Sequence, residues 1–507
     1  MGKGKTYKKL HKWPGLIIAF MLLYFSVTGI LMNHRNVISG LDISRDILPS
    51  NYRYDNWNLS AVKGSQYIGA DSVLLFGNIG IWLTDSLYEN YVSFNHGFPH
   101  GADNHKIFDV HKTSSGNIYA ATLSGFYTYK KNDGLWKKID VDVSINRFVG
   151  IESLEDTLYA MNRSYIFKGL DKGINTKLQK TELPAPTGYK NEVSVFETIW
   201  QIHSGEIFGL PGKLFTDILG LITIFISFTG IIFFFFPKWI KQRRKKGKNF
   251  KRIAKTNKWS LKWHNKTGRW IFVFLSILFF TGTFLRPPLL IAIANLKVAP
   301  IPFSHLDQPN PWYDKLRDIR FDAKRNTFLI ATSEGIYHTN LNLRNIQKFR
   351  VQPPVSVMGI TVFEPYKKGA YLIGSFSGLF LWHPEHREIL DYAKGNLYRS
   401  RSGGRPVGEY AVTGLIEKRN GKQYMIDYDK GAIPLWHKEQ FPQMPNKISE
   451  KSNMSLWNLS LEIHTGRFFS FLFGDFYILL VPLSGLIAVM VVISGYLLYR
   501  KRFKVRH

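Results

Sequence analysis

The sequence predicts a membrane protein with an α-helical four-helix bundle, arranged as a tandem 2+2 repeat, and an extracytoplasmic all-β domain. Three observations predict this fold class. Four long apolar stretches are spread along the 507 residues, residues of the first two helices recur in the last two, and a strand–turn–glycine pattern recurs between the helices. A chain of this length also exceeds what one hydrophobic core usually organises.

Four apolar stretches are each close to the roughly 20 residues that a bilayer crossing needs. They are Leu16–Met32, Leu214–Phe236, Ile271–Leu285 and Phe476–Tyr499. The first has the basic flank of a signal peptide, but the sequence NHRN at 33–36 follows it in place of a small-residue cleavage site. We therefore expect an uncleaved anchor and four transmembrane helices.

These helices divide the chain into seven expected segments. In order, they are the first helix with the N-terminus (1–34), a first external β segment (35–202), the second helix (203–237), a basic loop (238–266), the third helix (267–286), a second external β segment (287–463) and the fourth helix with the C-terminus (464–507).

The charge distribution orients these segments. The chain has 67 Lys and Arg against 37 Asp and Glu, and the loop 238–266 alone holds 13 of the basic residues and no acidic residue. By the positive-inside rule, this loop and both termini face the cytoplasm and the two long segments lie outside. Nucleic-acid binding by the run Arg243–Lys248 is the competing interpretation. Topology and attraction to anionic lipid explain the same charges, so we expect a lipid bilayer and no nucleic acid as partner.

Residues of the first and second helices recur in the third and fourth. At a constant offset, the matches are His11 with His264, Gly15 with Gly268, and Thr28-Gly29 with Thr281-Gly282. With one gap, IHSG at 202–205 matches IHTG at 463–466, Gly220 matches Gly485, and Thr229-Gly230 matches Ser494-Gly495. Because each unit begins and ends in the cytoplasm, the two repeats should be related by a pseudo-twofold axis along the membrane normal.

The duplicated histidines are the candidate cofactor ligands. The absence of cysteine excludes thiolate ligation of haem, iron–sulfur clusters and zinc. His11 and His264 lie at the cytoplasmic ends of their helices, and His203 and His464 lie at the outer ends. A bis-imidazole haem needs two neutral histidines and small residues beside them, and facing helices of a bundle can supply both. We expect these four residues to bind two b-type haems, one near each membrane face.

His34 lies beyond the outer end of the first helix, and Pro287 stands at the equivalent position of the second repeat. His34 could replace one of the outer ligands. Asp217 and Asp475 lie near the outer ends of the second and fourth helices, where they could carry protons or surround a cofactor. Packing and solvated helix ends are the alternatives for such residues, although ionisable groups inside a membrane are usually functional.

The helices carry four diagnostic stretches, namely HKWPGLIIAFMLLYFSVTG, IHSGEIFG with LGLITIFISFTG, HNKTGRWIFVFLSILFFTG, and IHTGRFF with SGLIAVMVVISGYLLYRKR. These stretches resemble the four helices of PepSY-associated transmembrane proteins, which include the ferric-siderophore reductases of bacterial inner membranes. The resemblance implies a dihaem transmembrane oxidoreductase that passes electrons from the cytoplasmic side to a ferric siderophore or similar chelate outside. His11, His203, His264 and His464 match the histidine positions of that family. The resemblance is confined to the helices, since the external segments lack the small α/β PepSY pattern.

The external segments carry a repeated pattern of a strand, a turn with glycine, and an aromatic strand, which is typical of β-hairpins. Copies lie at 73–82, 118–127, 328–337 and 371–380, with weaker copies at 158–167 and 424–436. Glycines 80 and 125, and glycines 335 and 378, are 45 and 43 residues apart, close to one propeller blade. Since three blades cannot close a ring, we expect both segments to assemble into one β-propeller of roughly six blades. Two separate β-domains are the alternative.

Two groups of external residues are candidate substrate-binding sites. His96, His100, His105 and His111 lie in a Gly-, Pro- and Asn-rich stretch and could bind a metal or an iron complex. No compact zinc spacing is complete among them, so solvated loop histidines are the alternative. Arg399, Arg401 and Arg405 lie around Ser402-Gly403-Gly404 and could attract an anionic chelate, or could belong to a flexible basic loop.

The expected cytoplasmic segments are too short for a nucleotide-binding domain of ordinary size. We therefore expect quinol or a separate cytoplasmic flavoprotein as electron donor, and the basic loop could dock the latter. The competing hypothesis is a membrane-anchored propeller that binds or senses an external ligand without redox activity. A transporter is disfavoured because four helices offer no clear polar pathway. The expected location is the bacterial inner membrane, with both termini cytoplasmic and the large domain periplasmic.

Overall fold

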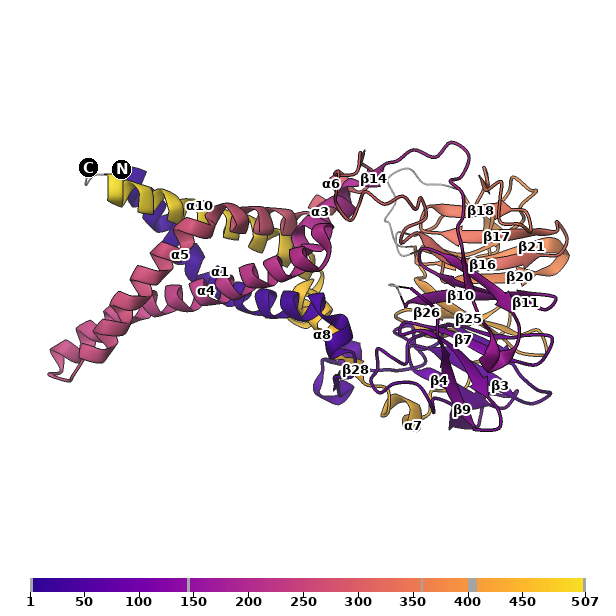
Figure 1. The fold of residues 1–507 in the computed structure, drawn as a ribbon. Coiled ribbons are helices and arrows are strands. Elements are labelled where there is room, and N and C mark those ends of the chain that lie inside the picture. Colours follow the sequence, from indigo (N-terminus) through magenta and orange to yellow (C-terminus); the bar gives the residue numbers. More distant parts are fainter. Residues whose placement is uncertain (1–2, 144–145, 357–358, 400–407, 505–507) are drawn as a thin grey trace. The chain divides into compact units, whose positions relative to one another are not determined.

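The computed structural model describes residues 3–143, 146–356, 359–399 and 408–504, which form two compact units (Figure 1). The helix unit comprises Met1–Ile38, Lys190–Gln308 and Leu456–His507. The β unit comprises Ser39–Tyr189 and Pro309–Ser455. Each unit therefore combines segments from both halves of the chain.

The helix unit contains four long helices. They are α1 (Lys3–Asn33), α4 (Gly209–Lys245), α5 (Lys251–Thr283) and α10 (Leu480–Lys504). Both α1 and α5 pack against α4 and against α10. The start of α1, the end of α10 and the α4–α5 connection lie at the same end of these helices (Figure 1).

Three helical segments of the described residues are long and apolar enough to cross a membrane. They are Thr6–Asn33, Glu206–Lys245 and Arg467–Lys501. These segments indicate a membrane protein. Helix α5 is not among them, because its first half is rich in Lys and Arg. A fourth crossing at 267–286 therefore stays a prediction.

The outer histidines lie on short helices, whereas the sequence placed them on the long ones. His203 belongs to α3 (Val195–Ser204) and His464 to α8 (Leu456–His464). Gly205 and Gly466 follow these helices, each with a φ of 78° that other residues adopt only with strain. The chain therefore turns before α4 and α10 begin.

Other short elements complete the helix unit. They are α2 (Arg35–Ile38), α6 (Leu289–Ile293), α9 (Ser470–Phe473), and the antiparallel pair β14 (Val193–Ser194) and β15 (Lys297–Val298).

The described residues of the β unit form six antiparallel sheets of three to five strands, in each of which consecutive strands are neighbours. Sheet 1 has β2 (Gly64–Tyr67), β3 (Val73–Gly77), β4 (Gly80–Thr84) and β5 (Tyr91–Ser93), and sheet 2 has β6 (Ile107–Lys112), β7 (Ile118–Thr122), β8 (Phe126–Lys130) and β9 (Leu135–Ile139). Sheet 3 has β10 (Phe148–Leu154), β11 (Thr157–Asn162), β12 (Ile166–Leu170) and β13 (Gln179–Thr181).

The second external segment supplies the other three sheets. Sheet 4 has β16 (Leu316–Asp322), β17 (Thr327–Thr332), β18 (Gly335–Thr339) and β19 (Gln347–Lys348). Sheet 5 has β20 (Val362–Tyr366), β21 (Ala370–Ser375), β22 (Gly378–Trp382), β23 (Leu390–Asp391) and β24 (Asn396–Leu397), and sheet 6 has β25 (Val412–Glu417), β26 (Gln423–Asp427) and β27 (Gly431–Leu435). Helix α7 (Asn446–Ser449) and the antiparallel pair β1 (Asp42–Ile43) and β28 (Met454–Ser455) complete the unit.

The hydrophobic core of the β unit lies between the sheets. In β3, Val73 and Leu75 pack toward sheet 6, while Leu74 and Phe76 pack toward sheet 2, because successive side chains of a strand point to opposite faces. Five core clusters join sheets 1 to 6 in succession, and a sixth joins sheet 6 to sheet 1. Residues from the beginning of one external segment and the end of the other therefore share a core.

Candidate functional site

The first candidate site is the pair His11 on α1 and His264 on α5, whose ring centroids lie 6.0 Å apart. Nδ1 of His11 lies 2.9 Å from the carbonyl oxygen of Val491 on α10. Nδ1 of His264 lies 3.1 Å from the carbonyl oxygen of Ile226 on α4. Each ring is thus held by a helix other than its own.

The second candidate site repeats this arrangement at the other end of the helices. The ring centroids of His203 on α3 and His464 on α8 lie 6.1 Å apart. Nδ1 of His203 lies 2.9 Å from the carbonyl oxygen of Leu278 on α5, and Nδ1 of His464 lies 3.0 Å from that of Phe25 on α1. The sequence repeat therefore relates the two histidine contacts within each site, and the two sites have the same kind of contact.

A glycine lies against each of the four rings, four residues after the carbonyl that the ring contacts. A Cβ at Gly495 would lie 2.7 Å from Cε1 of His11, and one at Gly230 would lie 3.2 Å from Cε1 of His264. A Cβ at Gly282 would lie 2.9 Å from Cε1 of His203, and one at Gly29 would lie 3.2 Å from Cε1 of His464. Three of the rings also have a threonine hydroxyl close to Nδ1. The hydroxyl of Thr229 lies 3.2 Å from Nδ1 of His264, that of Thr281 lies 3.3 Å from Nδ1 of His203, and that of Thr28 lies 3.1 Å from Nδ1 of His464. The recurring Thr-Gly pair therefore forms a contact surface for an imidazole ring.

The hydrogen bonds determine which ring nitrogen is available. A carbonyl oxygen can only accept, so Nδ1 of each ring carries the proton and Nε2 keeps its lone pair. No hydrogen bond to these four Nε2 atoms occurs among the described residues. Such a bond at Nδ1 is the usual support of a metal-ligating histidine. Two imidazoles that ligate one metal atom from opposite sides, with bonds of about 2 Å, have ring centroids about 6 Å apart. Both pairs have this spacing.

His34 contacts Asp217 and does not take part in the outer pair. Its Nε2 lies 2.7 Å from Oδ2 of Asp217, and the amide of Asn33 donates to Oδ1 at 2.9 Å. The buried carboxylate of Asp217 is therefore held by two neighbouring residues at the end of α1.

The four histidines of the first external segment are not brought together. His96 and His100 are exposed, the ring of His105 packs against Phe98, and Nε2 of His111 lies 2.8 Å from the hydroxyl of Ser153. Burial lowers the pKa of His111 below its ordinary value. No group of three or more His, Asp or Glu suited to a metal ion occurs in the described part of the chain.

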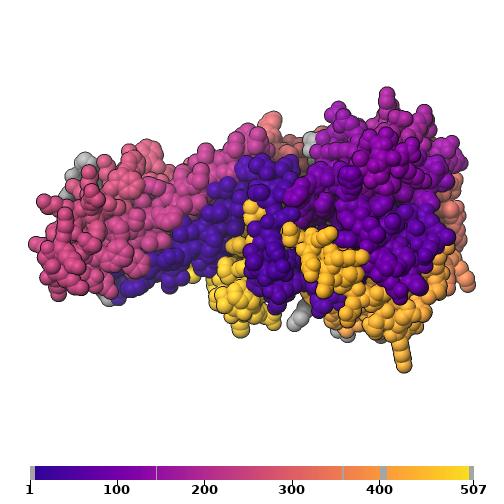
Figure 2. All heavy atoms as spheres, turned by 90° about the horizontal axis from the view of Figure 1, so that it is seen from below, coloured from indigo at the N-terminus to yellow at the C-terminus, as the bar shows by residue number. Residues whose placement is uncertain are grey.

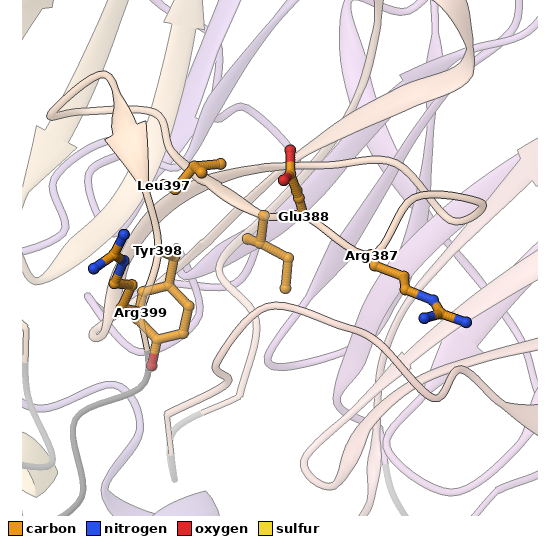
Figure 3. Close-up of a pocket in the computed structure, with 6 residues that line it drawn as sticks. Arg387, Glu388, Leu397, Tyr398 and Arg399 are labelled. Carbon is orange, nitrogen blue, oxygen red and sulfur yellow. The ribbon is translucent and has the colours of Figure 1, made fainter.

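Arg399 lines a pocket of about 180 Å³ in sheet 5, below the usual size of a small-molecule site (Figure 3). The other lining residues are Arg387, Glu388, Ile389, Leu397 and Tyr398. The guanidinium groups of Arg387 and Arg399 point away from each other (Figure 3). They do not converge on one anion. Arg401 and Arg405 lie outside the described residues.

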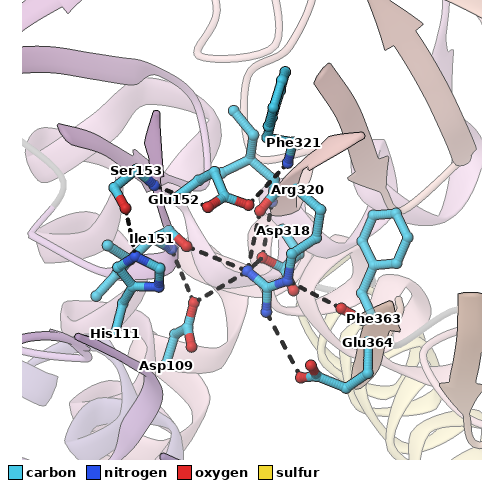
Figure 4. Close-up of polar contacts among 11 residues, drawn as sticks. Asp109, His111, Ile151, Glu152, Ser153, Asp318, Arg320, Phe321, Phe363 and Glu364 are labelled. Carbon is cyan, nitrogen blue, oxygen red and sulfur yellow. Dashed lines mark hydrogen bonds and ion pairs between the residues drawn. The ribbon is translucent and has the colours of Figure 1, made fainter. Parts of the chain in front are cut away.

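Sequence reasoning missed a charged cluster around Arg320 (Figure 4). Its guanidinium contacts Asp318 at 3.0 Å, Asp109 at 3.4 Å and Glu364 at 3.8 Å, and it donates to the carbonyl oxygens of Ile151 and Phe363. These partners lie on β16, β6, β20 and β10, the first strands of four sheets. The signal in the sequence was a charged residue at alternate positions of an otherwise apolar strand, as in LRDIRFD at 316–322.

The PepSY-associated TM region matches this chain twice, over residues 2–236 and 237–502. The chain belongs to the PepSY-associated transmembrane family. The resemblance read from the helix sequences is thus confirmed, and each half of this PepSY-associated protein matches the same family region. No curated protein matches the sequence significantly.

Among solved structures, the protein is similar to the extracellular domain of BT4673 from B. thetaiotaomicron, described as a hybrid two component system. The two share 10% identity over 75% of this chain and 33% of that chain, with a TM-score of 0.37. The computationally designed Ika8 protein shares 9% identity over 76% of this chain and 99% of that one, with a TM-score of 0.30. This chain spans about a third of the BT4673 chain. These likenesses carry no argument about function.

Proposed function

We propose that this PepSY-associated protein is a dihaem b-type electron-transfer protein of the bacterial inner membrane. It would reduce an extracytoplasmic ferric chelate, such as a siderophore complex, with electrons from the cytoplasmic side or from quinol. The observation that carries the proposal is the pair of histidine sites, with ring centroids 6.0 and 6.1 Å apart and every Nδ1 held by a carbonyl.

The residues of both sites fit a bis-imidazole haem. Each site offers two neutral imidazoles with Nε2 available, which is the ligand set of a six-coordinate b-type haem. At the four glycines, the absence of a Cβ leaves room for the rings against the neighbouring helices. When bound, a haem supplies one-electron oxidation and reduction, and the protein tunes its potential. We assign His11 and His264 to the inner haem and His203 and His464 to the outer haem.

The spacing of the two sites supports transfer across a membrane. His11 lies on α1, and Gly29 of the same helix contacts His464. At 1.5 Å per residue, these positions lie about 27 Å apart along α1, close to the thickness of a bilayer core. The two pairs would therefore carry electrons between the two membrane faces.

We further propose that the six sheets are the blades of one β-propeller assembled from both external segments. The succession of core clusters, in which sheet 6 shares a core with sheet 1, supports this arrangement. The propeller would receive the ferric chelate, and four crossings would place both termini in the cytoplasm.

The basic α4–α5 hairpin supports a separate flavoprotein as a possible donor. Figure 2 shows this hairpin, in pink, extending beyond the indigo start of α1. It exposes Trp239 and Trp259 among its Lys and Arg residues, each with 49% of its surface accessible. An acidic partner would be attracted by such a surface.

The test is an absorbance spectrum and a haem count on protein purified in detergent. We expect low-spin b-type bands and two haems per chain, one haem in either His264→Ala or His464→Ala, and none in the double variant. His96→Ala, which changes an exposed histidine of the β unit, is the matched control and should keep both. Folded protein that stays colourless after expression with ample haem would overturn the proposal.

A further inference from the structure

Two arginines closely follow residues of the outer histidine site in the sequence. Arg286 stands four residues after Gly282, whose backbone touches His203. Arg467 stands three residues after His464 and begins a 3-10 turn.

Each of the two guanidinium groups has a donor that no described residue accepts. Arg467, whose side chain is 39% exposed, contacts Glu462 at 2.5 Å through its Nη2. The Nε atoms of both arginines are buried and have no hydrogen-bond partner among the described residues. A buried N–H that lacks an acceptor is costly, so this arrangement calls for an anion.

The duplicated scaffold does not require arginines at these positions. The equivalent residues of the first repeat are Asn33 and Glu206, by the offsets that relate His11 to His264 and His203 to His464. Asn33 donates to Asp217 at 2.9 Å, and Glu206 contacts Lys213 at 3.1 Å. The first repeat thus has neutral and acidic groups where the second has two cations.

We propose that Arg286 and Arg467 bind the propionate carboxylates of the outer haem. This inference rests on the proposed function and adds residues to the outer site that the histidine pattern does not assign. Guanidinium groups form strong, directional hydrogen bonds with carboxylates. Their positive charge would also favour the reduced haem, which carries one more electron than the oxidised form. The pair therefore holds the outer haem and raises its reduction potential.

The experiment uses single-haem proteins. His264→Ala keeps only the outer haem, and His464→Ala keeps only the inner one. The substitutions Arg286→Gln and Arg467→Gln are combined in each background, and the haem is titrated potentiometrically while its absorbance is recorded. In the outer-only protein we expect the reduction equilibrium constant to fall about tenfold, which is about 59 mV for a one-electron couple. The inner-only protein should keep its potential. Lys213→Gln, from the first repeat, is the matched control and should leave both unchanged.

A second arm uses haem dimethyl ester, whose propionates carry no charge. In outer-only protein loaded with the ester, the arginine substitutions should no longer shift the potential. If the outer-only protein binds haem but its potential does not respond to the substitutions, the inference is overturned and the proposed function stands. If the folded wild-type protein binds no haem, both fail. If the glutamine variant loses its haem, the double variant Arg286→Lys with Arg467→Lys decides the question. Recovered haem binding in the lysine variant supports recognition of the propionate carboxylates by positive charge. Continued loss of haem overturns the inference.

Discussion

His203 reaches its position because Gly282 has no side chain. A Cβ at position 282 would lie 2.9 Å from Cε1 of the ring, and Nδ1 of the ring bonds to the carbonyl oxygen of Leu278 on the same helix. The other three histidines use Gly29, Gly230 and Gly495 in the same way. At the scale of the residue, the candidate sites therefore depend as much on glycine as on histidine.

Gly282→Ala tests this dependence. The added Cβ would lie 2.9 Å from Cε1 of His203, so the ring must move and the outer haem should be lost or held by one ligand. Gly268→Ala is the matched control on the same helix, since nothing lies within 4 Å of its Cβ position. The control should keep both haems and gain about 0.5–1 kcal/mol of helix stability. Haem content is measured from absorbance per chain. Equal haem content in the two variants would contradict the proposed contact between Gly282 and the ring of His203.

Lys63 provides a pH-dependent prediction in the β unit. Its Nζ lies 4.8 Å from the ring centroid of Phe108, which Arg147 also contacts. Burial, and then Arg147, lower the pKa of Lys63 from 10.5 to about 8. The folded state thus disfavours the charged amine, and the cost is present below pH 8 and disappears as the pH rises toward 10.5.

Lys63→Met should therefore be more stable than the wild type at pH 7, by about 3 kcal/mol at most, since one pKa unit is worth 1.36 kcal/mol. The advantage should shrink steadily between pH 8 and pH 10. Thermal unfolding of both proteins across this range measures the difference. A difference that does not change with pH would show that the amine titrates as an ordinary lysine.

At the scale of the element, two left-handed glycines separate the histidine-bearing helices α3 and α8 from the long helices that follow. Gly205 and Gly466 both have a φ of 78°. Their surroundings differ, because a Cβ at Gly205 would lie 2.2 Å from the carbonyl oxygen of Gly212, while one at Gly466 would lie 3.3 Å from the movable side chain of Leu480. The two turns are alike in conformation and unlike in packing.

Gly205→Ala should therefore be the more damaging of the two substitutions. Both lose about 1–2 kcal/mol from the left-handed conformation, and Gly205→Ala loses more because a backbone atom cannot yield. We expect a lower melting temperature and less outer haem in Gly205→Ala than in Gly466→Ala. Melting curves and the haem count report the two effects, and similar losses in both variants would contradict the packing difference.

At the scale of the whole molecule, the β unit depends on contacts between distant parts of the chain. Arg320 joins strands β6, β10, β16 and β20, which come from both external segments (Figure 4). Burial raises the pKa of Asp318, an effect that the charge of Arg320 opposes. Removal of this cation would leave several carboxylates inside the protein without their partner.

Arg320→Met should destabilise the β unit by about 3–5 kcal/mol, the usual effect of breaking a buried ion pair. Arg350→Met replaces an exposed arginine of the same unit and should change stability by less than about 0.5 kcal/mol. Urea unfolding followed by tryptophan fluorescence measures both. A small effect at Arg320 would mean that water already screens its partners.

The number of membrane crossings is also a property of the whole molecule, and the absence of cysteine makes it testable. Single cysteines at Lys131, Lys246 and Lys501 can each be labelled without background. If α5 crosses the membrane, Lys131→Cys reacts in intact spheroplasts, and the other two react with an impermeant thiol reagent only after permeabilisation. If there are only three crossings, Lys246→Cys and Lys501→Cys will react from opposite sides.

The family, the apolar helices, the histidine repeat and the hairpins of the external segments all follow from the amino-acid sequence. These features are local or periodic, so each follows from residue type and spacing: apolar length for the helices, alternation and turn glycines for the strands, and a fixed offset for the repeat. The contacts of His34 and the dispersal of His96, His100, His105 and His111 were not accessible in this way, because spacing along a loop does not determine where side chains point.

The tertiary structure added contacts that residue type and spacing do not predict. The carbonyls that hold the four histidines, and the short helices that carry His203 and His464, depend on how the helices lie against one another. The same holds for Arg320, whose partners come from four strands. Contacts between residues hundreds of positions apart form because the assembled core excludes water and favours partners for buried polar groups, and that preference has no signature in local sequence.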